Sequence, residues 1–286
     1  MAIPLVCVII PTFNRGDMVG RAISSVLYQT FQDYEIIVVD DGSADQTLSK
    51  LRPFERVVRI LKHETNRGVS AARNTAIRES SSPLIAFLDS DDYWLPDKLR
   101  AQVEFFKDNP EALACQTQEI WVRNGQRVNP GKKHQKLSGH IFEPSLKLCM
   151  VSPSSVMLRR TLLDEVGLFD EELPVCEDYD LWLRVTSRYP VYLINKYLVV
   201  KDGGRPDQLS RSTPAMDRFR IKALVKLIQS GALGKDQRKA ALDELSFKCR
   251  IYANGCLKRG RKEEGRYYLD LPQHMVQFCL NTTNSS

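Results

Sequence analysis

The hydrophobic pattern of the first hundred residues alternates between two kinds of segment. Short apolar, partly β-branched runs predict strands at residues 5–10, 35–39, 57–61 and 84–88. Periodic stretches between them predict helices at residues 17–27, 45–51 and 70–78. Strands and helices that alternate in this way favour an α/β fold with a mostly parallel, Rossmann-like sheet flanked by helices.

Carboxylates follow two of the predicted strands. Asp40 and Asp41 come directly after the second run, and Asp89 and Asp91 come directly after the fourth. Because ligands of open α/β sheets bind outside the carboxyl ends of the strands, we expect both pairs at one edge of the sheet. Asp89 and Asp91 supply oxygen ligands of the kind that Mg²⁺ and Mn²⁺ prefer. The pattern therefore predicts a divalent-cation site that also takes a phosphate-bearing substrate.

Each acidic segment also has a purely structural explanation. Asp41-Gly42 is ordinary turn chemistry. The turn that contains Asp89 precedes a helix that begins near residue 96, for which Asp92 or Asp97 is a suitable N-cap. Two polar sites at the same predicted edge favour the functional interpretation over two separate coincidences.

A third acidic segment opens a helix in the second half of the chain. Residues 177–184 place Asp178 at a helix start and Trp182 on its apolar face. An N-cap role for Asp178 explains much of this string. A carboxylate that is held rigidly at a helix start can also remove a proton, so capping and chemistry are both open for Asp178.

Five strings of the chain resemble glycosyltransferase family 2, the inverting nucleotide-sugar transferases of GT-A fold. They are VIIPTFNR, QTFQDYEIIVVDDGSADQT, NRGVSAARNTAI, AFLDSDDYW and VCEDYDLWLRV. The resemblance covers most of residues 3–210, with the motifs in the expected order. It implies a nucleotide-sugar donor, a divalent cation and an acceptor hydroxyl on a glycan, a lipid-linked glycan or a protein.

The resemblance also implies roles for individual residues. The nucleotide is cradled by Pro11, Thr12, Phe13 and Asn14, and its base is contacted by Asp41, with Asp40 beside it, and by Arg73. The family's Asp-x-Asp motif for metal and diphosphate corresponds to Asp89, Ser90 and Asp91. The general base corresponds to Asp178. We further expect substrate contacts from Glu177, which is the second candidate base, and from Trp182.

The segment 201–210 departs from the family pattern. It is expected to be a loop that closes over the donor, and relatives often carry a histidine near position 205 that assists the metal. This chain has Arg205 there. A guanidinium cannot ligate a cation, so Arg205 is expected to contact the diphosphate directly.

Composition and charge exclude several other classes of protein. The chain has 286 residues, of which 43% are hydrophobic and 27% charged, and no apolar run approaches the ~18 residues of a membrane span. The seven cysteines are scattered, which favours reduced thiols and a cytoplasmic protein without a secretory signal. The four histidines lack ligand spacing, so zinc is disfavoured, and no nucleic-acid-binding motif is present.

The chain ends in a region of helical periodicity with a basic balance. Helices are expected at residues 219–228, 237–248, 251–257 and 263–269. Residues 211–270 hold fifteen Lys and Arg against seven Asp and Glu, a balance of +8, whereas the whole chain is +6. Such helices can contact an anionic membrane from its inner face, a phosphate-bearing acceptor or a second copy of the chain, or can simply be solvated.

These observations predict a division of the chain and a function. Residues 1–210 form the GT-A domain, with a nucleotide-binding half at 1–110 and an acceptor half at 111–210, and residues 211–286 form a helical extension. The expected function is metal-dependent inverting glycosyl transfer, in surface polysaccharide biosynthesis. The alternatives are a nucleotidyltransferase and a catalytically silent sugar-nucleotide-binding protein. The basic stretch 125–139 is either a binding lid or a solvated loop.

Overall fold

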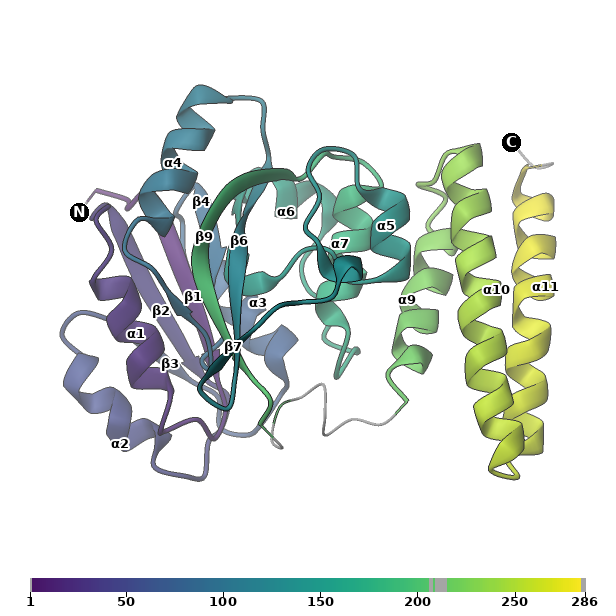
Figure 1. Cartoon of the computed structure of the whole chain (residues 1–286), viewed down its shortest axis with the longest axis horizontal. Coiled ribbons are helices and arrows are strands. Elements are labelled where there is room, and N and C mark those ends of the chain that lie inside the picture. The colour runs from purple at the N-terminus through teal and green to yellow at the C-terminus, as the bar shows by residue number, and fades with distance from the viewer. Residues whose placement is uncertain (1, 206–207, 209–214, 284–286) are drawn as a thin grey trace.

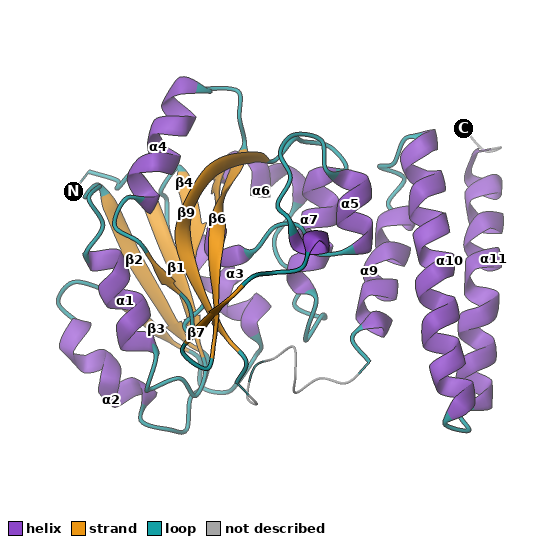
Figure 2. Cartoon of the chain, in the orientation of Figure 1, coloured by secondary structure: helices purple, strands orange, loops and turns teal. Residues whose placement is uncertain are grey.

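The computed structural model describes residues 2–205, 208 and 215–283. These residues contain one nine-stranded sheet of order β3-β2-β1-β4-β8-β6-β9-β5, with β7 paired to β6. The strands are β1 (Val6–Thr12), β2 (Tyr34–Asp40), β3 (Arg59–Lys62), β4 (Leu84–Phe87), β5 (Tyr93–Trp94), β6 (Ala114–Arg123), β7 (Gln126–Val128), β8 (Val156–Arg159) and β9 (Tyr192–Gly203). Figure 1 and Figure 2 show helices on both faces of this sheet.

The first half of the sheet is the parallel α/β series that the sequence predicts. β1 pairs in parallel with β2 and β4, and β2 pairs in parallel with β3. The helices of this half are α1 (Val19–Leu27), α2 (Thr47–Leu51), α3 (Val69–Glu79) and α4 (Lys98–Asp108). All four strand carboxyl ends therefore meet at one edge, where the acidic segments lie.

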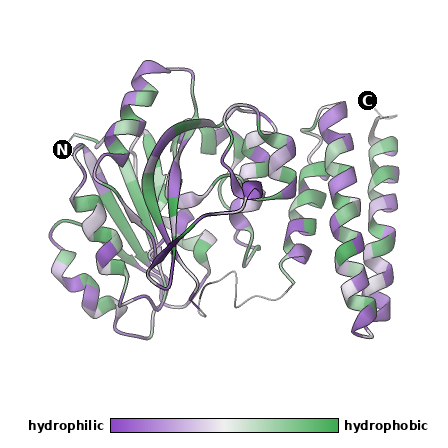
Figure 3. Ribbon diagram, in the orientation of Figure 1, coloured by the Kyte–Doolittle hydropathy of each residue, from purple (hydrophilic) through white to green (hydrophobic). Residues whose placement is uncertain are grey.

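Alternation along the central strands sends side chains into two separate cores. Val8 and Ile10 pack with α1 and α4 on one face, whereas Ile9 and Phe87 pack with α3 and two later helices on the other. Successive residues of a strand point to opposite faces, so a strand covered on both sides is apolar throughout. The central strands are accordingly the greenest elements in Figure 3.

The second half of the sheet is mixed rather than parallel. β8 runs antiparallel to both β4 and β6, β5 runs antiparallel to β9, and only β6 and β9 are parallel to each other. The expectation of a mostly parallel sheet therefore holds for the nucleotide-binding half alone. The helices of this half are α5 (Phe142–Lys147), α6 (Arg160–Val166) and α7 (Glu177–Thr186).

The basic stretch 125–139 is mostly exposed, as expected of a solvated loop, but it is anchored to the sheet through β7 and Lys136. It contains β7, which pairs with β6, and it carries Lys136 into the interior. Lys136 Nζ donates to Gln116 Oε1 at 2.9 Å and to Ser155 Oγ at 2.7 Å, and it lies 3.4 Å from Glu119. This buried pairing ties the stretch to the sheet.

Three helices end the described chain, and they share a core with the α/β body. They are α9 (Asp217–Gln229), α10 (Lys235–Lys258) and α11 (Lys262–Thr283), and they lie beside α5 and α7 (Figure 1). The expected helices 237–248 and 251–257 are one continuous helix, because the buried residues Cys249, Tyr252 and Cys256 continue a single stripe along α10. Gly265 permits the close approach of α11, since a Cβ there would lie 2.8 Å from Leu257 Cδ2.

The described helices include none that is both long and apolar enough to pass through a bilayer. All seven cysteines are free thiols, and six of them are buried. The 201–210 segment is only partly a loop, because residues 201–203 complete β9. Residues 206–207 and 209–210 of that expected loop, and the expected domain boundary at 210/211, lie outside the described residues.

Candidate active site

A cleft of about 990 Å³ opens at the carboxyl ends of β1, β2 and β4. Most of the residues that the sequence assigns to the donor and to the chemistry line this one cleft. They are Pro11, Thr12, Phe13, Asn14, Asp41, Arg73, Asp89, Ser90, Asp91, Glu177 and Asp178. The topology therefore brings five separate segments of the chain to one place, at the edge of the sheet where the parallel strands end.

The loop after β1 has the features of a ligand-binding turn. Asn14 adopts a left-handed backbone with φ 51°, a conformation that asparagine tolerates better than most residues. Its Oδ1 accepts from the backbone N–H of Ala44, and its own N–H donates to Ser43 Oγ, both at 2.9 Å. Thr12 Oγ1 is buried and has no hydrogen-bond partner among the described residues, although Thr12 lines the cleft. A ligand would supply that partner.

Asp41 is held rigidly at the floor of the cleft. Its Oδ1 accepts from the backbone N–H of Arg67 at 3.0 Å and contacts His63 Nδ1 at 2.6 Å, while its Oδ2 accepts from the N–H of Gly68 at 2.8 Å. Oδ2 therefore keeps one lone-pair direction for a ligand, whereas both directions of Oδ1 are occupied. Asp40 beside it is fully buried and does not line the cleft, so it cannot contact a base there.

Arg73 joins the two sides of the cleft. Its guanidinium is 3% exposed and donates to Asp89 Oδ1 at 2.8 Å and to Glu177 Oε1 at 2.7 Å. It also lies 5.0 Å from the ring centroid of Phe169. The expected contact of Arg73 with the base stays a prediction, and it would require the guanidinium to share or exchange one of these two carboxylates.

The turn after β4 supplies a pair of carboxylates suited to a hard cation. Burial, together with the charge of Asp89, raises the pKa of Asp91 above its ordinary value. A bound cation would relieve that repulsion, so the oxygen donors fit Mg²⁺ or Mn²⁺. Among the described residues no group of three or more metal-ligating side chains is present, so diphosphate oxygens and water would complete the shell.

The capping explanation for this turn holds only for the position of Asp97. Asp92 is buried, accepting from Ser154 Oγ at 2.6 Å and from the backbone N–H of Asp202 at 3.2 Å. Asp97 occupies the N-cap position of α4 but makes no capping hydrogen bond, and its Oδ1 accepts from Thr30 Oγ1 instead. Neither residue accounts for Asp89 and Asp91, which remain directed to the cleft.

Helix α7 carries Glu177 and Asp178, which line the same cleft. Its N-cap is Cys176, with a left-handed φ of 63°, so the expectation that Asp178 caps this helix is wrong. A non-glycine residue in this conformation costs of order 1–3 kcal/mol and is frequent at functional sites. Here the strained turn delivers Glu177 and Asp178 as the first two helical residues, at the positive end of the helix dipole.

The environment of this carboxylate pair is asymmetric. Burial and the neighbouring charge of Asp178 outweigh the pull of Arg73 and raise the pKa of Glu177 to about 7. Asp178 Oδ2 lies 3.3 Å from the thiol of Cys149, and Asp178 Oδ1 accepts from the backbone N–H of Tyr179. Burial and the charge of Asp178 raise the pKa of that thiol well above its ordinary value, so it stays protonated and donates.

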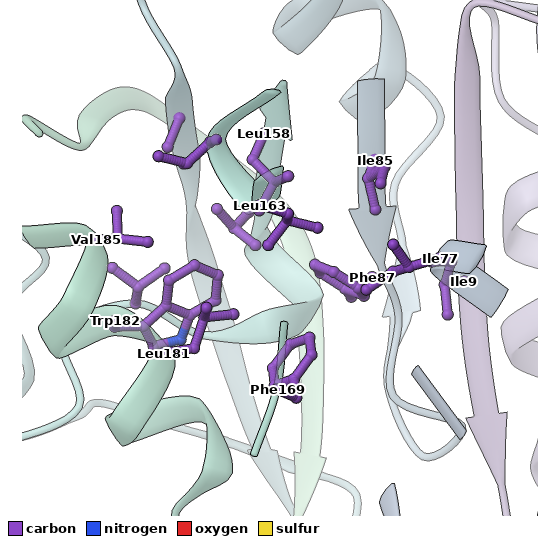
Figure 4. Packing of buried hydrophobic residues seen from close by; sticks show 14 of the residues in the cluster. Ile9, Ile77, Ile85, Phe87, Leu158, Leu163, Phe169, Leu181, Trp182 and Val185 are labelled. Atoms are coloured by element: carbon purple, nitrogen blue, oxygen red, sulfur yellow. The ribbon is translucent and has the colours of Figure 1, made fainter. Parts of the chain in front are cut away.

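Two further residues with expected substrate contacts are absent from the lining of the cleft. Trp182 is 1% exposed and packs with Leu181 and Val185 in the core of the sheet face shown in Figure 4. The apolar face of α7, which the sequence showed, accounts for it fully. Arg205 is half-buried and is not among the residues that line the cleft in the described part of the chain.

Lys201 is a cleft residue that the sequence did not identify. It stands near the end of β9, lines the cleft, and donates from Nζ to Ser152 Oγ at 3.2 Å. Burial lowers its pKa, but the charges of Glu119, Asp92, Asp89 and Asp178 outweigh burial and raise it above the ordinary value. The sequence placed Lys201 in a flexible loop, and only the pairing of β9 with β6 brings it among these carboxylates.

The fold and this cleft define a glycosyltransferase of GT-A type. The chain belongs to glycosyltransferase family 2, whose model matches residues 7–167. It is 35% identical over 192 residues, 67% of this chain and 73% of the relative, to the Escherichia coli UDP-Glc:alpha-D-GlcNAc-diphosphoundecaprenol beta-1,3-glucosyltransferase WfgD. It is 30% identical over 83% of this chain to the succinoglycan biosynthesis protein ExoU of Rhizobium meliloti, of which it covers 73%.

Solved structures show the same fold at lower sequence identity. The S. aureus TarS 1-349 complex with UDP-GlcNAc superposes with a TM-score of 0.74 at 20% identity, over 95% of this chain and 80% of that one. The mannosyltransferase PcManGT of Pyrobaculum calidifontis, in complex with GDP-Man and Mn²⁺, gives a TM-score of 0.58 at 16% identity, over 96% of this chain and 86% of that one. The resemblance seen in the sequence motifs is therefore confirmed, and the chain is a glycosyltransferase rather than a nucleotidyltransferase.

Proposed function

We propose that this enzyme transfers a sugar from a UDP-sugar to a hydroxyl of a lipid-linked glycan, with inversion at the anomeric carbon, in surface polysaccharide biosynthesis. The observation that carries the proposal is the presence of carboxylates from two separate elements in one cleft, which we call its two walls. Asp89 and Asp91 follow β4, Asp178 belongs to α7, and all three line the cleft. The relatives support the donor and acceptor classes, because WfgD uses UDP-Glc and a diphosphoundecaprenol-linked sugar and ExoU acts in succinoglycan biosynthesis.

The two walls match the two ends of a direct displacement. The acceptor hydroxyl must lose a proton on the side of the sugar that faces away from the leaving diphosphate. Asp178 is the base for that step, since a carboxylate within reach of the hydroxyl can take its proton in the transition state. Cys149 and the N–H of Tyr179 hold this carboxylate in place. One displacement inverts the anomeric carbon, and no covalent sugar–enzyme intermediate forms.

The other wall receives the leaving group. Thr12 and Asn14 would position the nucleotide, and Asp41 would accept a hydrogen bond from its base. A divalent cation held by Asp91 and Asp89 would neutralise the charge that gathers on the departing diphosphate. Lys201 lines the same cleft and adds a fixed positive charge there. Buried, preorganised charges of this kind are worth more than exposed ones, because no solvent must reorganise during the step.

Three expectations from the sequence remain proposals. They are a cytoplasmic location with peripheral contact to an anionic membrane, association of two copies through the C-terminal helices, and Arg205 as a diphosphate contact. Exposed apolar side chains on α10 and α11, such as Ile251 and Leu280, support the first two, together with the basic balance of this region.

The substitution Asp178→Asn tests the proposal. It keeps the size of the side chain and can still accept from Tyr179 N–H, but an amide cannot take a proton. We expect sugar transfer to fall by about 100-fold to 10,000-fold, the usual contribution of acid–base catalysis. UDP affinity, measured by calorimetry with Mn²⁺, should stay within about twofold of the parent because the donor wall is untouched.

The parent enzyme in the same assay tests the alternative function, that of a catalytically silent sugar-nucleotide-binding protein. Turnover of UDP-sugar with a lipid-linked acceptor contradicts the silent alternative, and an Asp178→Asn variant that transfers at the parent rate removes Asp178 from the mechanism. Glu177→Gln is the matched control, because the Glu177 carboxylate of the parent forms an ion pair with Arg73. Product stereochemistry, read by NMR of the new glycosidic bond, decides inversion.

A further inference from the structure

A second concave surface lies on the C-terminal helices, outside the donor cleft. It is a groove of about 400 Å³ between α9 and α11. Its lining combines aromatic, aliphatic and cationic side chains: Arg218, Phe219, Ile221, Lys222 and Val225 of α9, and Tyr267, Tyr268 and Leu271 of α11. We refer to these eight residues as the α9–α11 groove.

The chemistry of the α9–α11 groove suits a molecule with an apolar body and a negatively charged end. Arg218 and Lys222 stand four residues apart on α9, so they project from the same face of the helix. Arg218 lies over the Phe219 ring at 4.5 Å, and Tyr267 is 57% exposed at the groove wall. Planar guanidinium groups pair well with phosphate oxygens, and aromatic walls pack against hydrocarbon.

The cations of the groove are available to a ligand. Arg218 is exposed, stacks on the Phe219 ring, and forms no ion pair with another residue in the described part of the chain. Lys222 pairs with Glu172 at 3.2 Å, but both side chains are well exposed, at 44% and 81%. An exposed pair of this kind contributes little stability, so a phosphate can compete for Lys222.

The groove adjoins the donor cleft through the start of α9. Met216, immediately before α9, lines the cleft, and Arg218 two residues later lines the groove. Glu172, the partner of Lys222, also lines the cleft. At a rise of about 1.5 Å per residue, Met216 and Lys222 are separated by about 9 Å along the axis. One extended molecule can therefore occupy both surfaces.

We infer that the α9–α11 groove binds the diphosphate and the first isoprenoid units of a lipid-linked acceptor, while the acceptor sugar enters the cleft beside Asp178. The inference rests on the proposed function, whose acceptor it specifies. The charge order fits, since a sugar–diphosphate–lipid presents its hydroxyl first, its phosphates next to Arg218 and Lys222, and its hydrocarbon last, against Tyr267 and Leu271. The inference also assigns a specific ligand to two of the basic residues that give the C-terminal helices their positive charge.

Binding of farnesyl diphosphate by the full-length protein tests this inference. Calorimetry compares the parent with Arg218→Gln and Tyr267→Ser, both exposed positions whose substitution should leave the fold intact. The matched control is Arg250→Gln on α10, because Arg250 also lies over an exposed aromatic ring, that of Phe247 at 6.0 Å, outside the groove. We expect about tenfold weaker binding for Arg218→Gln, the scale of a hydrogen bond to a charged group, and less than twofold for Arg250→Gln.

Three further ligands identify what the groove recognises. Farnesol and inorganic diphosphate should each bind at least about tenfold more weakly than farnesyl diphosphate, because each lacks one half of the chemistry. Vesicles that contain phosphatidylglycerol should lose no more affinity with Arg218→Gln than with Arg250→Gln. Equal losses of farnesyl diphosphate binding for the two variants, unchanged affinity in Arg218→Gln, or a vesicle effect confined to Arg218→Gln would each overturn the inference.

The two proposals fail in different ways. If the groove inference is wrong, Arg218→Gln leaves farnesyl diphosphate binding unchanged, whereas Asp178→Asn still abolishes transfer. If the proposed function is wrong, Asp178→Asn leaves turnover unchanged whatever the groove binds. UDP affinity should be equal in the parent, Arg218→Gln and Tyr267→Ser, and this measurement shows that the donor cleft is intact in all three.

Discussion

Replacement of Arg73 by methionine should destabilise the enzyme strongly, because Arg73 is the only described residue that forms an ion pair with Glu177. The guanidinium is 3% exposed and the Glu177 side chain 7%, and their atoms lie 2.7 Å apart. Removal of one partner of a buried pair typically costs about 3–5 kcal/mol, because the other charge stays buried. The Asp89 side chain is 28% exposed and is hydrated once Arg73 is removed, so the loss of its ion pair adds less to the free-energy cost. We expect a loss of about 3–5 kcal/mol at pH 8.

The loss should depend on pH in a defined direction. Without Arg73 the Glu177 carboxylate becomes harder to ionise, so its pKa in the folded variant rises further above the parent's value of about 7. The folded variant then binds more protons than the unfolded chain over a wider range, and its stability falls more steeply as pH rises. Urea denaturation should therefore show a smaller cost at pH 5 than at pH 8.

A double-mutant cycle isolates this pair from packing effects. Glu177→Gln removes the stranded charge, so Arg73→Met/Glu177→Gln should recover about 2 kcal/mol relative to Arg73→Met alone at pH 8. The matched control is Arg78→Met on the same helix, whose pair with Glu171 is exposed, and it should cost less than about 1 kcal/mol. A cost below about 1 kcal/mol for Arg73→Met, or strict additivity in the double variant, would refute the bridging role.

Three other predictions concern the same cleft. Asp91→Asn should abolish most of the gain in UDP affinity that Mn²⁺ gives the parent, and a parent that binds UDP equally well in EDTA would show the metal assignment to be wrong. The free energy of unfolding of the parent should fall by about 3 kcal/mol between pH 4.5 and 7, because the pKa of Glu177 is raised to about 7 in the folded state and the folded protein therefore binds the extra proton in that window. Glu177→Gln should flatten this dependence on pH. A flat curve for the parent contradicts the assignment. Lys201→Met should cost about 3 kcal/mol and weaken UDP more than uridine, whereas Lys196→Met, exposed on the same strand, should do neither.

The first half of the fold could be predicted because its signals are local. Each of the strands β1, β2 and β4 is apolar on both faces, and each ends where a polar segment begins, so strand ends and site residues coincide in the sequence. Boundaries shifted by one or two residues, as with β3 at Arg59–Lys62 instead of 57–61. The carboxylates Asp41, Asp89 and Asp91 follow directly from this placement.

The second half could not be predicted because its pairings join distant segments. β8 inserts antiparallel between β4 and β6, and nothing in residues 156–159 specifies either partner or direction. The pairing of β9 with β6 is also non-local, and it brings Lys201 near the charges of Glu119 and Asp92. The start of α7 also depends on tertiary contacts, since a left-handed cysteine replaces the expected aspartate cap. The sequence therefore predicts the correct helix for Asp178, but the N-cap role that it suggests for Asp178 belongs to Cys176.

The composition change near residue 211 marks a boundary in the sequence but not in the packing. Leu224 and Leu245 of the C-terminal helices share a hydrophobic cluster with Tyr179 and Leu183 of α7, the helix that carries the base. Lys226 also donates to Asp180 Oδ1 of α7 at 2.9 Å. The opposite face of α7 packs on the sheet. Helix α7 therefore packs on both the sheet and the C-terminal helices, so a contact that shifts the C-terminal helices bears on Asp178 directly. Asp89 is linked to the same helix through the ion pairs of Arg73.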